Sequence, residues 1–129
     1  MPHKQHCILA FILFSSLFSC SSKIELEHID LDSWKKDRNG CLGLRMLDLE
    51  DFKSAKDDLL GKDNQALIKT FGRPDKVELA DRSQTFFIYY FEGGPSCGNS
   101  ENKDDALKAI FRLNAISRVS EVTVSTLNP

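Results

Sequence analysis

The apolar positions in the first half of the chain recur at helical spacing. Asp30 or Asp32 can cap a short helix that contains Leu31 and Trp34. The Asn-Gly pair at residues 39–40 is a typical helix end, because both residues tolerate a left-handed backbone. One short helix is therefore predicted just before the first internal cysteine.

A stronger helical pattern follows. Asp48 stands at the N-cap position, and the acidic residues after it favour the positive end of a helix dipole. The apolar stripe of this helix consists of Leu49, Phe52, Ala55 and Leu59. Gly61 is a suitable stop, and Asp63 can begin a third helix that ends at Gly72 and Pro74. The helical half of the chain is therefore expected to end before residue 75.

The second half of the chain has the alternation of β-strands. Val77 and Leu79 indicate a short extended piece, and residues 85–91 form TFFIYYF, the densest aromatic and β-branched run. Two further strands are predicted at about 107–114 and 118–127. Three strands in a meander need a cover on their apolar face, and the helices are the only candidate. The sequence therefore predicts an α+β fold, a two-layer sandwich with N-terminal helices packed on a three-stranded antiparallel meander.

The strand at 85–91 carries more aromatic side chains than one buried face needs. Alternate side chains point to opposite faces of a strand. If the helices cover only one face, the other is left for a partner protein. We interpret the outward, partner-binding set as Phe87, Tyr89 and Phe91. The alternative is that the loop at 92–105 or the N-terminal segment folds across this outer face.

Composition and charge exclude several classes of protein. The 129 residues are 41% hydrophobic and 28% charged, which is the balance of one globular domain. Neither wholesale disorder nor a multi-pass membrane protein fits these values. The 17 basic and 19 acidic side chains give a net charge of −2. Because nucleic-acid binding needs a basic patch or stripe, no nucleic-acid partner is expected.

The N-terminus is typical of a secretion signal. Lys4 precedes an apolar run at residues 7–18, which is far shorter than the ~20 residues of a membrane-spanning helix. The sequence Leu-Phe-Ser-Cys that ends at Cys20 resembles the lipobox of bacterial lipoproteins, in which the cysteine carries lipid. We therefore expect a signal peptide at 1–19, a lipidated Cys20 with a tether at 20–29, and a single domain at 30–129. A buried N-terminal helix is the alternative.

The predicted signal peptide assigns different roles to the four cysteines. Cys7 is removed with the signal and Cys20 carries lipid, which leaves Cys41 and Cys97 in a compartment where disulfides persist. A bond between these two cysteines would stabilise the fold by about 4 kcal/mol in the chain-entropy model. Two buried free thiols are the alternative. Neither cysteine lies in a CxxC pair, so redox catalysis and zinc binding are not expected.

No catalytic or metal-binding pattern is recognisable. After signal removal His28 is the only histidine. The acidic pairs at 57–58 and 104–105 lack the spacing of a calcium loop. The Gly-Gly-Pro at 93–95 lacks the lysine and the strand-to-helix setting of a phosphate loop. We therefore expect no catalytic residues, no metal, no cofactor and no small-molecule substrate.

Three short motifs suggest a family. They are LGKD at 60–63, FGRPDKV at 71–77 and FIYY at 87–90. Together with the lipobox they resemble the SmpA/OmlA lipoproteins over about residues 48–125. That family includes BamE, a lipoprotein of the outer-membrane barrel-assembly machine, and shares its fold with β-lactamase-inhibitor-type domains. The leader WKKDRNGC at 34–41 and the internal cysteine pair depart from the BamE pattern and are more similar to envelope lipoproteins of the Bacteroidetes type.

The resemblance implies a function as well as a fold. We expect a non-enzymatic lipoprotein of the outer membrane, on its periplasmic face, that contacts the membrane through lipid on Cys20 and binds another envelope protein. An accessory role in barrel assembly or envelope integrity follows from the family. Ser21 stands where an aspartate retains enterobacterial lipoproteins at the inner membrane, which favours the outer membrane. The alternative is an inhibitor or ligand-binding module of the β-lactamase-inhibitor type.

Overall fold

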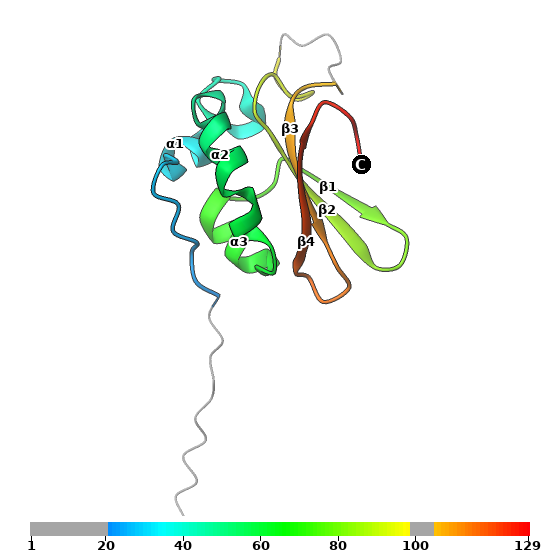
Figure 1. Ribbon diagram of the computed structural model, residues 1–129. Coiled ribbons are helices and arrows are strands. Elements are labelled where there is room, and N and C mark those ends of the chain that lie inside the picture. The colour runs from blue at the N-terminus through cyan, green and yellow to red at the C-terminus, as the bar shows by residue number, and fades with distance from the viewer. Residues whose placement is uncertain (1–20, 99–104) are drawn as a thin grey trace, which may run out of the picture.

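Helices pack on one face of an antiparallel sheet, as the sequence pattern predicted (Figure 1). The computed structural model describes residues 21–98 and 105–129. The α+β class is therefore confirmed. The number of strands is not, because the described part of the chain contains a sheet of four strands rather than three.

Within the residues that the structure describes, the helical layer is built from three short α-helices and three 3₁₀ turns. They are α1 (Leu31–Lys36), η1 (Arg38–Gly40), η2 (Arg45–Asp48), α2 (Leu49–Ala55), η3 (Lys56–Leu59) and α3 (Asn64–Phe71). Two predicted caps are confirmed. Asp30 Oδ1 accepts a hydrogen bond from the Ser33 amide at 3.1 Å, and Asp63 Oδ1 accepts one from the Ala66 amide at 2.8 Å.

The predicted second helix starts where expected but ends early. Asp48 stands at the N-cap position of α2 as predicted, yet its side chain makes no capping hydrogen bond, because the carboxylate turns back and accepts a hydrogen bond from the Asp30 amide at 3.2 Å. The α-helix ends at Ala55, and the chain continues as the tighter turn η3 up to Leu59. The apolar stripe of this helix was thus correctly predicted, but the Asp48 carboxylate binds the backbone of Asp30 rather than that of α2.

The sheet is a meander of antiparallel strands in the order β1-β2-β3-β4. The strands are β1 (Lys76–Ala80), β2 (Gln84–Tyr90), β3 (Lys108–Leu113) and β4 (Val119–Ser125). The short extended piece predicted around Val77 is the additional strand β1, in which Val77 pairs with Phe87 of β2. The aromatic strand is therefore an inner strand with neighbours on both sides.

A bulge between β3 and β4 changes which side chains reach the core. Arg112 pairs with Glu121 but Leu113 pairs with Val119, so the register shifts between them. As a result Val119 and Val122 are both buried in the core, although strict alternation assigns them to opposite faces.

Aromatic rings fill the space between the two layers. The ring of Trp34 stacks on that of Phe52, with 5.4 Å between centroids, and meets the edge of Phe91 at 5.3 Å. Phe71 and Phe111 extend this cluster, with 5.7 Å between their centroids. Each of these five side chains is fully buried. The cluster fixes the helices to the sheet and leaves the opposite sheet face to other segments.

Candidate functional site

The predicted partner-binding residues of β2 lie in the core. Phe87, Tyr89 and Phe91 expose 8%, 0% and 0% of their surface, and all three face the helices. The prediction that this set faces outward is therefore wrong. Both faces of the strand carry aromatic side chains, so the alternation alone could not show which face the helices cover.

Tyr89 has a structural role within this core. Its hydroxyl donates a hydrogen bond of 2.8 Å to the carbonyl of Gly72, at the end of α3. Burial raises the pKa of the Tyr89 phenol far above its usual range, and the negative charge of Asp75 raises it further. The phenol therefore stays protonated and links the sheet to a helix end.

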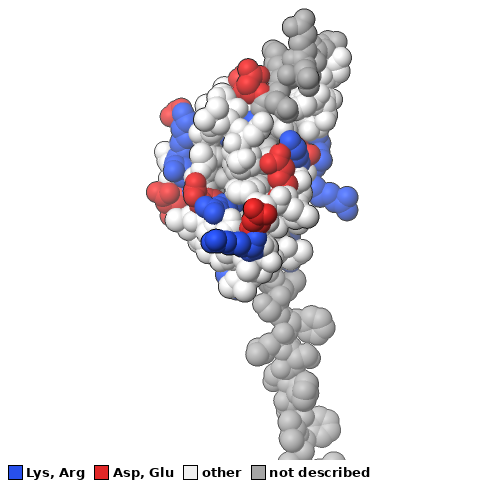
Figure 2. Space-filling view, turned by 90° about the vertical axis from the view of Figure 1, so that its right-hand side faces the viewer, with Lys and Arg blue, Asp and Glu red and all other residues white. Residues whose placement is uncertain are grey.

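The outer face of the sheet carries the other set of apolar side chains. Ile88, Tyr90 and Ile110 are buried there together with Ala106, while Phe86 is half-buried. Figure 2 shows this face, with uncharged residues at its centre and charged side chains around them. A shallow groove of about 270 Å³ crosses it, and its lining includes Phe86, Ile110, Arg112, Glu121 and Leu127.

Segments after β2 and after β4 close over one end of the outer face. A side chain at Gly94 would come within 2.8 Å of the Tyr90 ring, so this part of the chain lies directly on the ring. The ammonium of Lys108 lies over the same ring, 5.7 Å from its centroid, and donates a hydrogen bond to Asn128 Oδ1. The covering loop considered as an alternative is therefore observed, but on the face of Tyr90.

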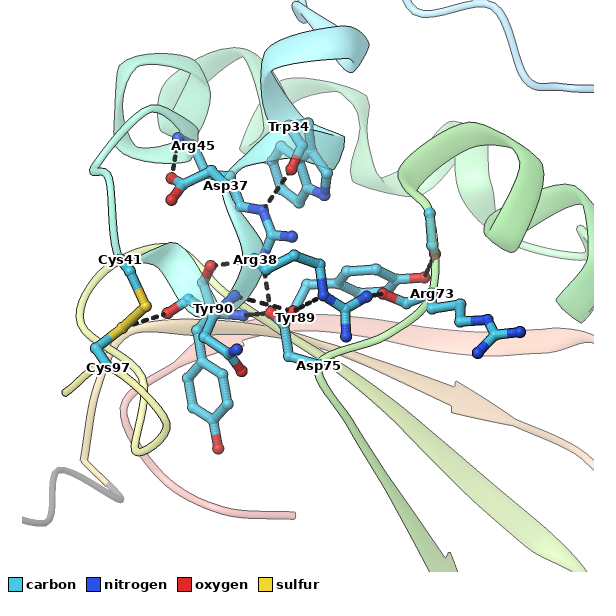
Figure 3. Close-up of polar contacts among 12 residues, drawn as sticks. Trp34, Asp37, Arg38, Cys41, Arg45, Arg73, Asp75, Tyr89, Tyr90 and Cys97 are labelled. Atoms are coloured by element: carbon cyan, nitrogen blue, oxygen red, sulfur yellow. Dashed lines mark hydrogen bonds and ion pairs between the residues drawn. A yellow bond between two sulfur atoms is a disulfide. The ribbon is translucent and has the colours of Figure 1, made fainter.

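Cys41 and Cys97 form the predicted disulfide, with Cα atoms 5.5 Å apart (Figure 3). Two backbone hydrogen bonds run beside it, from the Gly93 amide to the Gly40 carbonyl at 3.0 Å and from the Gly94 amide to the Asn39 carbonyl at 2.8 Å. The disulfide and these bonds hold the segment after β2 against η1.

Next to the disulfide lies a buried ion pair between the two layers (Figure 3). Arg45 Nη1 is 2.6 Å from Asp75 Oδ2, and both side chains are fully buried. The guanidinium also donates to the carbonyls of Trp34 and Tyr90, at 3.0 and 2.9 Å, and lies 5.2 Å from the centroid of the Trp34 ring. Arg45 thus connects α1, the start of β1 and the end of β2.

Both oxygens of each buried carboxylate in this region accept hydrogen bonds from the protein. Asp75 accepts further hydrogen bonds from the amides of Asn39 and Tyr90, at 3.0 and 2.9 Å. Asp37 accepts from the amides of Leu42 and Arg45, at 2.7 and 3.0 Å. These two carboxylates therefore hold η1, η2 and the end of β2 together and have a structural function.

Sequence reasoning missed Arg45 and Asp37. Asp75 lies in the FGRPDKV motif, but its partner was not identified. A signal was present, since Arg45 stands between Leu44 and Met46, and a charge inside an apolar run must find a buried partner or reach water.

The segment predicted as a free tether is packed along the domain. We call residues 21–29 the N-terminal strap. Ser21 Oγ donates a 2.6 Å hydrogen bond to Asp63 Oδ2, the Ile24 amide donates to Thr70 Oγ1 at 2.8 Å, and Ile29 is buried. The hydrogen bond from Ser21 is the main reason that the pKa of Asp63 is lowered, followed by the bond from the Ala66 amide. Cys20, the predicted lipidation site, lies outside the described residues.

A groove of about 530 Å³ runs between the strap and the end of the domain. Its charged lining residues are three cations and three acids, namely Lys23, Lys62, Arg118, Glu25, Asp58 and Asp63. The formal charges of these lining residues sum to zero.

Strand β1 is an edge strand with exposed apolar side chains. It has one strand neighbour, β2, among the described residues. Leu79 and Val77 expose 84% and 51% of their surface and share the sheet face of Phe87, to which Val77 is paired. The β1–β2 hairpin extends away from the helical layer (Figure 1), so the helices leave this part of the face uncovered.

Within the described ranges, no three histidine, cysteine or acidic side chains gather into a group that could hold a metal ion. The same part of the chain has no helix that is both long enough and apolar enough to cross a membrane. The chain matches no family model, no curated protein and no solved structure.

Proposed function

We propose that this protein is a non-enzymatic envelope lipoprotein, anchored at the outer membrane by lipid on Cys20, which binds another envelope protein through the edge of its sheet. The signal-like residues 1–19 and the lipobox support the anchor. The Cys41–Cys97 disulfide supports a location outside the cytosol, because such bonds persist in oxidising compartments.

The observation that carries the binding proposal is the exposure of Leu79 on an edge strand. An edge strand presents backbone N–H and C=O groups that can pair with a strand of another chain, and native proteins usually protect such edges. Here Lys76 and Glu78 form an ion pair of 2.7 Å on one face. The other face keeps Val77 and Leu79 exposed, so one side of β1 remains suited to an apolar contact.

The partner that fits this edge is an extended segment with apolar side chains at alternate positions. Backbone pairing would add a fifth strand to the sheet, and Val77 and Leu79 would supply the side-chain contacts. The accessory role in barrel assembly or envelope integrity, suggested by the SmpA/OmlA resemblance, is part of this proposal and depends on the identity of the partner.

The absence of enzymatic activity is also proposed. The carboxylates of Asp37 and Asp75 are buried and engaged by backbone donors, and the phenol of Tyr89 is held protonated. The adjacent acids Asp57 and Asp58 are exposed to solvent. These arrangements support structural functions for the ionisable groups that the core contains.

The binding proposal can be tested by photo-crosslinking in native envelopes. A photo-reactive amino acid would replace Leu79 in one variant and Leu47 in a control, because these two side chains are 84% and 80% exposed. We expect one defined crosslinked product at position 79 and none at 47, and we expect L79R to lose the partner while L47R keeps it.

The identity of the crosslinked protein distinguishes a lipoprotein that binds an envelope protein from an inhibitor module. An integral or lipid-anchored envelope protein would support the proposal, and a barrel-assembly subunit would support the specific role. A single soluble enzyme would instead favour an inhibitor module. Equal crosslinking at positions 79 and 47 would contradict the assignment of the β1 edge.

A further inference from the structure

We infer that the N-terminal strap fixes the domain directly against the lipid bilayer, with the turn at residues 114–117 in contact with the headgroup region. The inference rests on the proposed lipid anchor at Cys20 and adds an orientation to it. The turn at 114–117 would contact the lipid bilayer itself and not a further protein.

The first step is that Ser21, the residue directly after the proposed anchor Cys20, is already bound to the domain. Cys20 is one peptide bond from Ser21, which places the two Cα atoms about 3.8 Å apart. Two polar groups of Ser21 are engaged by the domain, since its hydroxyl donates to Asp63 and its carbonyl accepts from Lys69 Nζ. The Ile24 amide is held by Thr70. Lipid on Cys20 would therefore hold the surface around Ser21 at the membrane.

The second step is that the β3–β4 turn lies at this same end of the molecule. The Asn64 amide donates to the Ser117 carbonyl at 3.0 Å, and the backbones of Asp63 and Arg118 form an isolated antiparallel β-bridge. Figure 1 shows the start of the strap and this turn at the same end of the fold. Asp63, which accepts the hydrogen bond from Ser21, is therefore also next to the β3–β4 turn.

The third step is the chemistry of the turn. Ile116 stands at its tip and is 72% exposed, and the cations Lys62 and Arg118, which line the groove at this end, are exposed as well. An exposed apolar side chain suits the boundary between headgroups and acyl chains. Because the groove next to it carries balanced charges, we expect Ile116 and the lipid to supply the contact, with little dependence on anionic lipid.

The test uses the mature lipidated protein, extracted from membranes and reconstituted in phosphatidylcholine vesicles. An environment-sensitive fluorophore is attached to I116C, and its quenching by spin-labelled lipids is measured. The matched control is L47C, which is 80% exposed and lies at the far end of the strap, where the adjacent Asp48 binds the Asp30 amide. We expect quenching to be several-fold stronger at position 116 than at 47. Adding anionic lipid should change it little.

A second variant tests the strap itself. A flexible Gly-Ser linker of about ten residues between Cys20 and Ser21 should reduce quenching at position 116 to the level of position 47, while the protein still floats with the vesicles. Equal quenching at 116 and 47 without the linker, or strong quenching that survives it, would overturn the inference. Failure of the unmodified protein to float with vesicles would instead contradict the proposed anchor.

Discussion

Arg45 and Asp75 form a buried ion pair, with 2.6 Å between Nη1 and Oδ2, although they are separated by two helices along the chain. The pair joins the helical layer to the sheet at the point where β1 begins. A disulfide and a buried ion pair thus both link distant segments at this end of the domain (Figure 3).

Removing Arg45 should destabilise the domain strongly. In R45M the carboxylate of Asp75 stays buried and keeps only the half-exposed Arg38, whose Nε lies 3.8 Å from Asp75 Oδ1, as an ion-pair partner. Breaking a buried ion pair costs about 3–5 kcal/mol. The free energy of unfolding, measured with urea, reports this loss. K53M is the matched control, because Lys53 pairs with Glu50 at 2.9 Å on the surface and exposed pairs contribute about 1 kcal/mol or less. Equal losses in the two variants would contradict a structural role for Arg45.

Substitutions on the two faces of the aromatic strand should differ in cost. F91A removes a ring that packs on Trp34 and Phe52, and we expect it to lower the free energy of unfolding by about 3–5 kcal/mol. F86A truncates a half-buried ring on the outer face and should cost clearly less. Urea unfolding of both variants checks the assignment, which fails if F86A is the more damaging.

Loss of the disulfide should destabilise the fold without altering its architecture. The C41S/C97S variant gives up a constraint on the unfolded chain of about 4 kcal/mol in the chain-entropy model. Reductant should lower the stability of the wild-type protein to that of the variant and leave the variant unchanged. A wild-type protein that is insensitive to reductant would contradict the expected contribution.

Two glycines with similar backbone angles should respond differently to alanine. Gly40 and Gly43 have φ values of +65° and +72°, so both variants pay about 1–2 kcal/mol for a left-handed side chain. At Gly40 the added Cβ would also lie 2.6 Å from the backbone nitrogen of Glu92, whereas nothing lies within 4 Å at Gly43. Thermal unfolding should therefore show a larger loss for G40A than for G43A. Equal losses would indicate that the segment after β2 is not held against η1.

The bond between Ser21 and Asp63 should be visible in the titration of Asp63. Its pKa is lowered from the ordinary value of 3.8, first by the Ser21 hydroxyl. A lowered pKa means that the carboxylate stabilises the fold fully above pH ~3.8, and that this contribution is lost as the pH falls through the folded pKa. In S21A the pKa of Asp63 should rise towards 3.8, as measured by NMR.

Asp30 provides the internal control for this titration. Its pKa is lowered by hydrogen bonds from Ser33, so S21A should leave it unchanged. An unchanged pKa at Asp63 in S21A would mean that the strap does not engage the domain in solution.

The helical layer could be predicted from sequence because its signals are local. Asp30 and Asp63 precede apolar stripes, and both cap the helices that follow them. Asp48 has the same local pattern, yet it binds the Asp30 amide instead. That contact joins residues 18 positions apart, and local spacing carries no information about it.

The face of the aromatic strand could not be predicted, because its alternation is apolar on both sides. Phe87 and Tyr89 belong to the core cluster under the helices, whereas Ile88 and Tyr90 pack with Ala106 and Ile110 on the outer face. The strand β1 was recognised only as an extended piece, since its five residues include two charged ones. Its pairing depends on the register with β2, which only the tertiary structure fixes.

The strap was mistaken for a tether because its sequence is short and polar. Its apolar residues Ile24, Leu26 and Ile29 alternate with charged ones, and they pack against the core cluster. The disulfide was predicted correctly because elimination left only Cys41 and Cys97.

The proposed lipid anchor at Cys20 can be checked through the intact mass of the protein extracted from membranes of the cells that make it. We expect a chain that begins at Cys20 and carries the added mass of diacylglycerol and an acyl group. The C20A variant should be lost from the membrane fraction. An unlipidated chain in the soluble fraction, or one that retains residues 1–19, would contradict the proposed anchor.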